Sequence, residues 1–299
     1  MALINKQIVM HVTVGNPSPE HARHSWMWAN RLARYPNRLH LELMDLGIDQ
    51  NQLNKLISDC IAINPNVTVQ TNTEQRSGGS ERHALGLNMA LKGIDKDSDD
   101  IHILADSDCY TIVKGWDDII QHLLGFTDCV GATYEPIGGF SSGTSEVQTY
   151  KGIPNCTWIA LCANADWNQL DCTPQLGTIK GFLDEEDASI HNLKMGNRLL
   201  RDVGWRLPRF LHDKGYSYIG LSHVKPSGTA LALKGLPDYH EEFVLAGMPI
   251  LAHQRGASKH RFAEGPLSER FIKTVDKWCS KQTDLEFVNP DDFEWEISK

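Results

Sequence analysis

Two aspartates one residue apart, Asp106 and Asp108, follow a short apolar run in the segment IHILADSDCYTIVKGW (101–116). Carboxylates at this spacing can both turn toward one point beyond the end of a buried strand. Such hard oxygen ligands favour Mg²⁺ or Mn²⁺, and Mg²⁺ is commonly bound through one or two carboxylates together with substrate phosphates. The pair is therefore a candidate metal site, and its alternative is a turn before a helix expected at 115–124.

Two other uses of paired aspartates fit the segment less well. As a calcium loop, DSDCYTIVKGWD lacks the glycine at its sixth position and the glutamate at its twelfth. In a haloacid dehalogenase-type phosphatase the aspartates should lie on the first strand, with Thr or Val two residues after the second, but Tyr110 stands there on a fourth strand. We reject the calcium loop and keep the phosphatase as an alternative function.

Alternating strands and helices are expected around the aspartates. Apolar runs predict strands at 8–14, 39–47, 67–72 and 101–105, and periodic apolar residues predict helices at 21–35, 51–63 and 81–94. This alternation favours an α/β fold with a mixed, mostly parallel sheet flanked by helices, whose ligands bind beyond the carboxyl ends of the strands. The two aspartates lie at such an end.

The periodicity weakens after about residue 135. There the sequence predicts a Gly/Ser-rich loop at 134–145, a strand at 156–163, a helix beginning near 182–190 and a loop-rich run at 215–260.

Composition narrows the class of protein. The chain has 299 residues with 41% hydrophobic content, a formal net charge of −9 and seven cysteines without a CxxC pair. The acidic balance disfavours a broad nucleic-acid surface, and the scattered cysteines favour a reducing compartment. We find no signal peptide, no membrane span and no evident amphipathic basic helix, so we expect a cytoplasmic protein.

Four segments together resemble the family 2-like glycosyltransferases of the GT-A fold. They are VTVGNPSP after the first strand, LMDLG at the end of the second, RSGGSERHALGLNMAL before the fourth and ILADSD at its end. The resemblance covers residues 7–125 well and returns at DEED and AHQRGASKH. It implies the Rossmann-like fold of nucleotide-diphospho-sugar transferases, and transfer of a sugar from a donor such as a UDP-sugar to an acceptor hydroxyl.

The resemblance also implies roles for individual residues. Asp106 and Asp108 would hold Mn²⁺ or Mg²⁺ against the donor diphosphate, with Ser107 beside them and His253 as a further ligand that suits manganese. The residues implied to contact the nucleotide sugar are Val14, Asn16, Pro17 and Asp45 near base and ribose, and Arg76 and Arg82 near diphosphate or sugar. Asp45 could equally be a turn residue, and either arginine could be a solvated surface charge.

An inverting transferase needs a carboxylate near the acceptor hydroxyl. The segment FLDEEDASI resembles the acidic segment where the family keeps this base, which points to Asp187 with Glu186 beside it. The alternative is structural, since Asp184 and Asp187 have the spacing of a helix N-terminus, where acidic residues are favoured. A retaining enzyme would not need this base.

These inferences divide the chain into a nucleotide-sugar-binding half (1–135), an acceptor-binding and catalytic half of the same domain (136–265), and a C-terminal helix with an acidic tail (266–299). The expected acceptor is a saccharide or another hydroxyl compound, and a hydroxylated base in phage DNA is a less favoured option. Besides the phosphatase, a non-catalytic nucleotide-sugar binding module remains an alternative.

Overall fold

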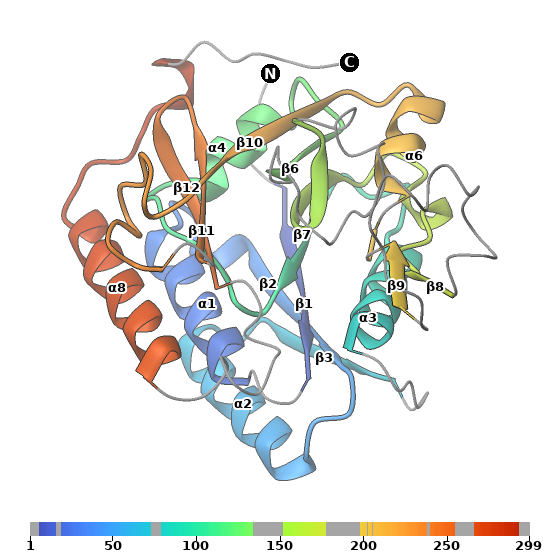
Figure 1. The fold of residues 1–299 in the computed structure, drawn as a ribbon, viewed down its shortest axis with the longest axis horizontal. Coiled ribbons are helices and arrows are strands. Elements are labelled where there is room, and N and C mark those ends of the chain that lie inside the picture. The colour runs from blue at the N-terminus through green and yellow to red at the C-terminus, as the bar shows by residue number, and fades with distance from the viewer. Residues whose placement is uncertain are drawn as a thin grey trace.

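The computed structural model of the chain describes most of its length, and Figure 1 shows the fold. The described residues are 6–15, 19–72, 79–133, 152–177, 198–201, 203–204, 206–237, 240–254 and 266–292.

The strands and helices alternate in the first half of the chain, as the sequence predicts. The strands are β1 (Ile8–Val14), β2 (Leu39–Asp45), β3 (Val67–Thr71), β4 (Ile101–Asp106), β5 (Cys109–Thr111), β6 (Cys129–Thr133), β7 (Pro154–Cys162), β8 (Gln175–Gly177), β9 (Arg198–Arg201), β10 (Tyr218–Val224), β11 (His240–Leu245) and β12 (Met248–Gln254). The helices are α1 (Pro19–Leu32), α2 (Gln50–Ile63), α3 (Gly79–Gly93), α4 (Trp116–Leu123), α6 (Leu207–Lys214) and α8 (Pro266–Thr283), with short 3-10 turns at Pro36–Arg38, Trp167–Gln169 and Pro290–Asp292.

Ten of the described strands form one sheet in the order β3-β2-β1-β4-β7-β6-β10-β11-β12-β5. The pairs among β3, β2, β1 and β4 are parallel, as is β6 with β10, while β7 runs antiparallel between β4 and β6. From β10 to β5 every pair is antiparallel. The predicted mixed α/β sheet is therefore confirmed. Four of its nine described strand pairs are parallel and five are antiparallel, so it is mostly parallel only in the half that contains β3, β2, β1 and β4.

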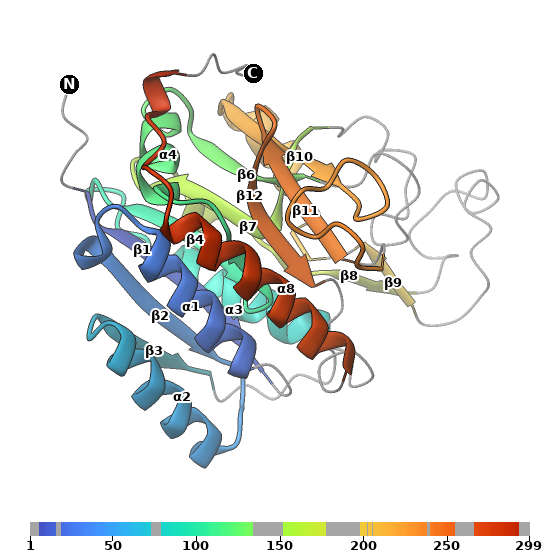
Figure 2. The ribbon, with the colours of Figure 1, turned by 90° about the vertical axis from the view of Figure 1, so that its left-hand side faces the viewer.

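Helices cover both faces of the sheet, as Figures 1 and 2 show. On one face, buried residues of α1, α2, α4 and α8 pack in one hydrophobic core with alternate residues of β1, β2 and β4. On the other face, α3 and α6 enclose a second core. Strand β4 shows why both layers form, because Ile101, Ile103 and Ala105 belong to the first core and Leu104 points to the second.

Helix α3 lies unusually close to the sheet because residue 86 is glycine. A Cβ at Gly86 would stand 2.7 Å from Cγ2 of Thr13 on β1 and 3.4 Å from Cβ of Met44 on β2. Helix α3 packs against β1 and β2, and its first turns reach the carboxyl end of β4, where His83 contacts Asp106.

The expectation of a loop-rich run at 215–260 is wrong, since β10, β11 and β12 lie within that range. The strand β11 was hidden because its first three residues, His240, Glu241 and Glu242, are polar and yet buried. The Gly/Ser-rich segment 134–145 and the helix expected near 182–190 lie outside the described residues. Among the helices that are described, none has both the length and the apolar character to cross a membrane.

Candidate metal centre

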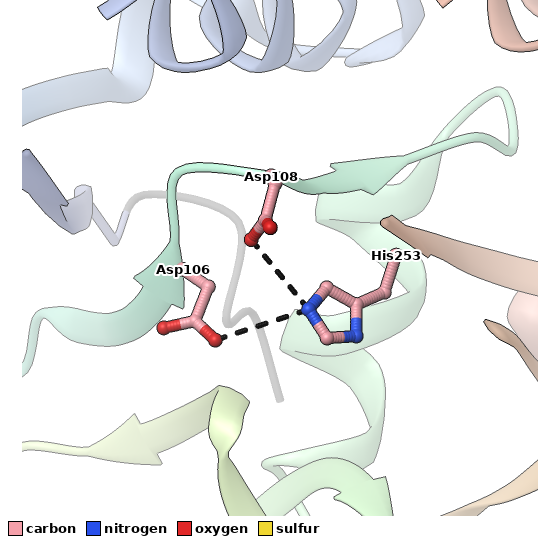
Figure 3. A group of neighbouring side chains, drawn as sticks. All are labelled: Asp106, Asp108 and His253. Atoms are coloured by element: carbon pink, nitrogen blue, oxygen red, sulfur yellow. Dashed lines mark ion pairs between the residues drawn. The ribbon is translucent and has the colours of Figure 1, made fainter. Parts of the chain in front are cut away.

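Asp106, Asp108 and His253 come together although Asp108 and His253 are 145 positions apart in the sequence. One potential ligand atom from each lies within 4.8 Å of the other two. Nε2 of His253 is 3.5 Å from Oδ1 of Asp108 and 3.9 Å from Oδ2 of Asp106, and Figure 3 shows the imidazole facing both carboxylates. This is a candidate metal site with two oxygen ligands and one nitrogen ligand.

The sheet explains why these side chains meet. Asp106 is the last residue of β4, and Asp108 immediately precedes β5. Because β5 pairs with β12 in a register that sets Cys109 opposite His253, the neighbouring Asp108 is held beside the imidazole. A backbone hydrogen bond of 3.1 Å from the N–H of Gln254 to the carbonyl of Asp108 fixes the same contact.

A buried carboxylate holds the other side of the His253 ring. Nδ1 of His253 donates to Oε2 of Glu241 over 2.8 Å, and Glu241 lies opposite His253 in the β11–β12 register. The second oxygen of Glu241 is 3.3 Å from Nε2 of His223 on β10. A carboxylate on the distal nitrogen of a metal-binding histidine fixes the ring orientation and the tautomer. Glu241 therefore leaves Nε2 as the atom that faces the two aspartates.

The electrostatics of the cluster agree with a cation site. Burial disfavours the charged imidazole, but Asp108 and Glu241 outweigh this effect and hold the pKa of His253 well above its ordinary value. Burial alone would raise the pKa of Asp108, yet the charge of His253 keeps it below its ordinary value. His253 is thus held as an imidazolium between carboxylates. A divalent cation can replace the proton of His253 as the positive charge between the carboxylates, because metal binding releases protons from the ligands.

His83 on the first turns of α3 contacts the same cluster from another side. Its Nε2 is 2.7 Å from Oδ1 of Asp106, and both side chains are about one quarter exposed, at 24% and 23%. The contact leaves Oδ2 of Asp106 directed at His253. His83 thus orients the more exposed of the two aspartates.

Asp45 and Val14 lie at the same edge of the sheet, paired in register at the ends of β2 and β1. Oδ1 of Asp45 accepts hydrogen bonds from the N–H groups of Gly47 and Ile48, at 2.9 and 3.0 Å. One carboxylate oxygen of Asp45 therefore closes the turn after β2, which is the structural role that the sequence left open. Contact of Asp45 or Val14 with a nucleotide stays a prediction.

The remaining predicted site residues divide into two groups. Ser107 is buried between the two aspartates, and Arg82 lies exposed on α3 next to His83. The predicted residues Asn16, Pro17, Arg76, Glu186 and Asp187 lie outside the described residues. The structure thus brings together the three expected metal ligands, and it leaves the expected base and part of the donor site undescribed.

Sequence reasoning missed His83, His223 and Glu241. His83 stands one residue after Arg82 in the segment RSGGSERHALGLNMAL, where the family resemblance implied a role only for the arginines. Glu241 and His223 carry no motif, and their proximity to His253 depends on the pairing of β10, β11 and β12.

No family model and no curated protein sequence matches the chain. Among solved structures, the chain is similar to the galactosyltransferase LgtC in complex with donor and acceptor sugar analogues, with 12% identity and a TM-score of 0.48 over 91% of this chain and 96% of that one. It is also similar to the apo form of the glycosyltransferase GlyE from Streptococcus pneumoniae, with 12% identity and a TM-score of 0.41 over 93% of this chain and 64% of that one.

A third similar structure is the mannosyltransferase PcManGT from Pyrobaculum calidifontis in complex with GDP-Man and Mn²⁺. That match has 15% identity and a TM-score of 0.38, and it covers 54% of this chain and 46% of that one. The three solved structures are all glycosyltransferases. At these scores the likeness identifies no substrate and no mechanism for this chain, so the function proposed below rests on the chain's own residues.

Proposed function

We propose that this chain is a metal-dependent glycosyltransferase that moves a sugar from a nucleotide-diphosphate sugar to an acceptor hydroxyl. The observation that carries the proposal is the meeting of Asp106, Asp108 and His253 beyond the carboxyl end of β4. Ligands of α/β sheets bind outside the carboxyl ends of strands, which is where a diphosphate would meet this cluster.

The three side chains suit a divalent cation such as Mn²⁺ or Mg²⁺. Two carboxylate oxygens satisfy either ion, and the imidazole favours manganese. When bound, the cation would stabilise the negative charge that grows on the departing nucleoside diphosphate. The chain's own contribution is orientation, because Glu241 fixes the ring of His253 and His83 fixes the carboxylate of Asp106.

The donor site proposed around this cluster follows the edge of the sheet. Val14 ends β1, which pairs with β4, and Asp45 ends β2 on the other side of β1. Helix α3 begins at the same edge. The proposed donor contacts are Val14, Asn16, Pro17 and Asp45 for the nucleoside, and Arg76, Arg82 and Ser107 for the diphosphate or sugar. In an inverting reaction Asp187, with Glu186 beside it, would take the proton from the acceptor hydroxyl.

Binding of manganese and of donor tests the proposal directly. Isothermal titration of the whole chain with Mn²⁺, and then with a panel of nucleotide sugars, should find one nucleotide family whose binding needs the metal. Asp106→Asn should abolish metal-dependent binding. The matched control is Asp99→Asn, because Asp99 is an exposed aspartate just before the amino end of the same strand.

The same experiment separates the alternatives. Nucleoside diphosphate released in the presence of acceptor would support transfer, and Asp187→Asn should stop that release while keeping donor affinity. Donor binding without turnover across a set of saccharide acceptors would instead indicate a binding module. A covalent aspartyl-phosphate on Asp106 would overturn the transferase in favour of a phosphatase.

A further inference from the structure

The outer side of α8 carries a row of basic side chains that the proposed reaction does not use. Arg270, Lys273, Lys277 and Lys281 follow each other at helical spacings of three and four residues, and Lys234 lines the same shallow pocket from the loop between β10 and β11. We call these five residues the basic face. Figure 2 shows α8 lying along the outside of the molecule, beside α1.

The basic face stands out because the chain as a whole is acidic, with a formal net charge of −9. Glu269 is the single acidic residue among the described residues that line the pocket. Its Oε2 lies 3.7 Å from Nζ of Lys273. The other acid of α8, Asp276, accepts a hydrogen bond from Nε1 of Trp28. Within the described part of the chain, Lys277 and Lys281 form no ion pair.

The folding of α8 does not require this charge pattern. The opposite side of the helix is anchored by Phe271, Val275 and Cys279, each at most 1% exposed. Like charges four residues apart, such as Lys273 and Lys277 or Lys277 and Lys281, repel each other and weaken an isolated helix slightly. The arrangement is thus better explained by an anionic partner than by helix stability.

An aliphatic side chain is held at the edge of the basic face. Leu231 is 54% exposed, yet its backbone is fixed, because the buried carboxylate of Glu242 accepts hydrogen bonds from the N–H groups of Leu231, Ala232 and Leu233 at 2.8 to 3.0 Å. Arg270 ties the same loop to α8 through a 2.9 Å hydrogen bond to the carbonyl of Gly235. Leu231 is therefore presented to solvent by a rigid loop.

We propose that the basic face and Leu231 form a docking surface for an anionic membrane. Lysines near a negatively charged leaflet gain attraction from its surface potential, and an exposed leucine gains from burial among the acyl chains. Single-stranded nucleic acid fits less well, because its binding relies on aromatic side chains that stack on bases. Trp278, the one aromatic residue lining the pocket, is half-buried and donates its Nε1–H to the carbonyl of Ile112.

This proposal does not depend on the transferase activity, and sedimentation with vesicles tests it. The whole chain should sediment with vesicles that contain phosphatidylserine, should not do so with pure phosphatidylcholine, and should be released by high salt. Because each lysine near such a surface contributes about a fivefold change in binding, Lys277→Gln with Lys281→Gln should weaken sedimentation roughly 25-fold. Leu231→Ser should weaken it further without changing the salt dependence.

The matched control is Lys92→Gln with Lys96→Gln, since both lysines are exposed, Lys92 in the last turn of α3 and Lys96 in the turn that follows it. The control variant should bind vesicles like the natural chain. Equal weakening by both double variants would overturn the proposal, as would failure of the natural chain to bind phosphatidylserine vesicles. Release from these vesicles by a short DNA duplex that binds more tightly would identify nucleic acid as the partner instead and would also overturn it.

Discussion

Glu241 and His253 lie opposite each other on the antiparallel strands β11 and β12, and Nδ1 of His253 donates a 2.8 Å hydrogen bond to Oε2 of Glu241. The bond leaves Nε2 of the ring facing Asp106 and Asp108. The orientation of the candidate nitrogen ligand therefore depends on a carboxylate that lies behind it, on the side away from the two aspartates.

Replacing that carboxylate should weaken metal binding without removing a ligand. We expect Glu241→Gln to lower the affinity for Mn²⁺ about 10- to 100-fold, because loss of the carboxylate behind a metal-binding histidine has this effect in other metal sites. The affinity can be measured from the electron paramagnetic resonance signal of free Mn²⁺.

The control for this variant is Glu286→Gln, since Glu286 is exposed and far along the chain from the cluster. It should bind manganese like the natural chain. If Glu241→Gln also does so, Glu241 does not orient His253 as a ligand. If Asp106→Asn leaves manganese affinity unchanged as well, the metal site itself is wrong.

The sequence predicted the position of the aspartates well because their signal is local. An apolar run that stops at a polar pair marks the end of a buried strand, and β4 indeed ends at Asp106. His253 likewise follows the apolar residues of PILAHQ, and β12 ends one residue later, at Gln254, but its role as a ligand came from the family resemblance. Their meeting could only be inferred through the family resemblance, since it depends on the pairing of β5 with β12.

What the sequence did not predict depends on buried polar residues. Strand β11 begins with His240, Glu241 and Glu242, all less than 9% exposed, so hydrophobicity gave no sign of a strand. Each of these polar side chains has a partner that is distant in sequence or lies in the neighbouring loop. The expectation that the chain has no amphipathic basic helix is also wrong, since α8 is buried on one side and basic on the other.

The close approach of α3 to β1 gives a second prediction. A Cβ at Gly86 would stand 2.7 Å from Cγ2 of Thr13. The branched side chain of Thr13 cannot easily rotate away from this clash. We expect Gly86→Ala to lower the free energy of unfolding by about 1–3 kcal/mol through overpacking. It should also move α3 outward and lengthen the contact between His83 and Asp106. Urea unfolding measures the first effect.

Gly93 offers a matched control in the same helix. A Cβ there would meet only Nε2 of Gln70, at 3.9 Å, so no neighbour has to move. Gly93→Ala should leave the free energy of unfolding unchanged or raise it by up to about 1 kcal/mol, because alanine favours helix. Equal effects of the two variants would mean that Gly86 is not needed for the packing of α3.

The loop that presents Leu231 should depend on Glu242. This carboxylate is fully buried and accepts three backbone hydrogen bonds, from residues 231, 232 and 233. Glu242→Gln should lower the free energy of unfolding by about 1–3 kcal/mol, since an amide can accept fewer of these bonds and its NH₂ group needs a partner.

Hydrogen exchange locates this effect along the chain. The amides of Leu231, Ala232 and Leu233 should exchange faster in Glu242→Gln, while those of β1 should change only as much as global stability does. If these three amides exchange as slowly in Glu242→Gln as in the natural chain, Glu242 is not the anchor of the loop.

A row of polar side chains across the sheet makes stability depend on pH. Nδ1 of His102 on β4 lies 2.9 Å from Nε2 of His11 on β1, whose Nδ1 is 2.5 Å from Oε2 of Glu42 on β2. Burial, helped by the neighbouring His11, lowers the pKa of His102 from 6.5 to about 4, against the opposing influence of Asp100 and Glu42. His102 therefore stays neutral in the folded chain at pH values where it is charged in the unfolded chain.

The sign of the pH effect follows from this difference. Between pH 6.5 and about 4 the unfolded state binds a proton at His102 that the folded state does not, so stability falls as the pH falls through that window. The contribution of His102 reaches about 3 kcal/mol, because one pKa unit corresponds to about 1.4 kcal/mol. Burial would raise the pKa of Glu42, but its hydrogen bond with His11 lowers that pKa below its ordinary value of 4.5. Glu42 therefore adds a further loss of stability as the pH falls below 4.5.

Urea unfolding at a series of pH values tests this assignment. The stability of His102→Gln should fall less steeply than that of the natural chain between pH 6.5 and 4, because glutamine can keep a hydrogen bond to His11 and does not titrate. His240, whose pKa burial also lowers to about 4, titrates in both proteins and cancels in the comparison. The control His212→Gln changes a side chain that is 88% exposed and should reproduce the natural curve. Parallel curves for the natural chain and His102→Gln would assign the pH dependence to other groups.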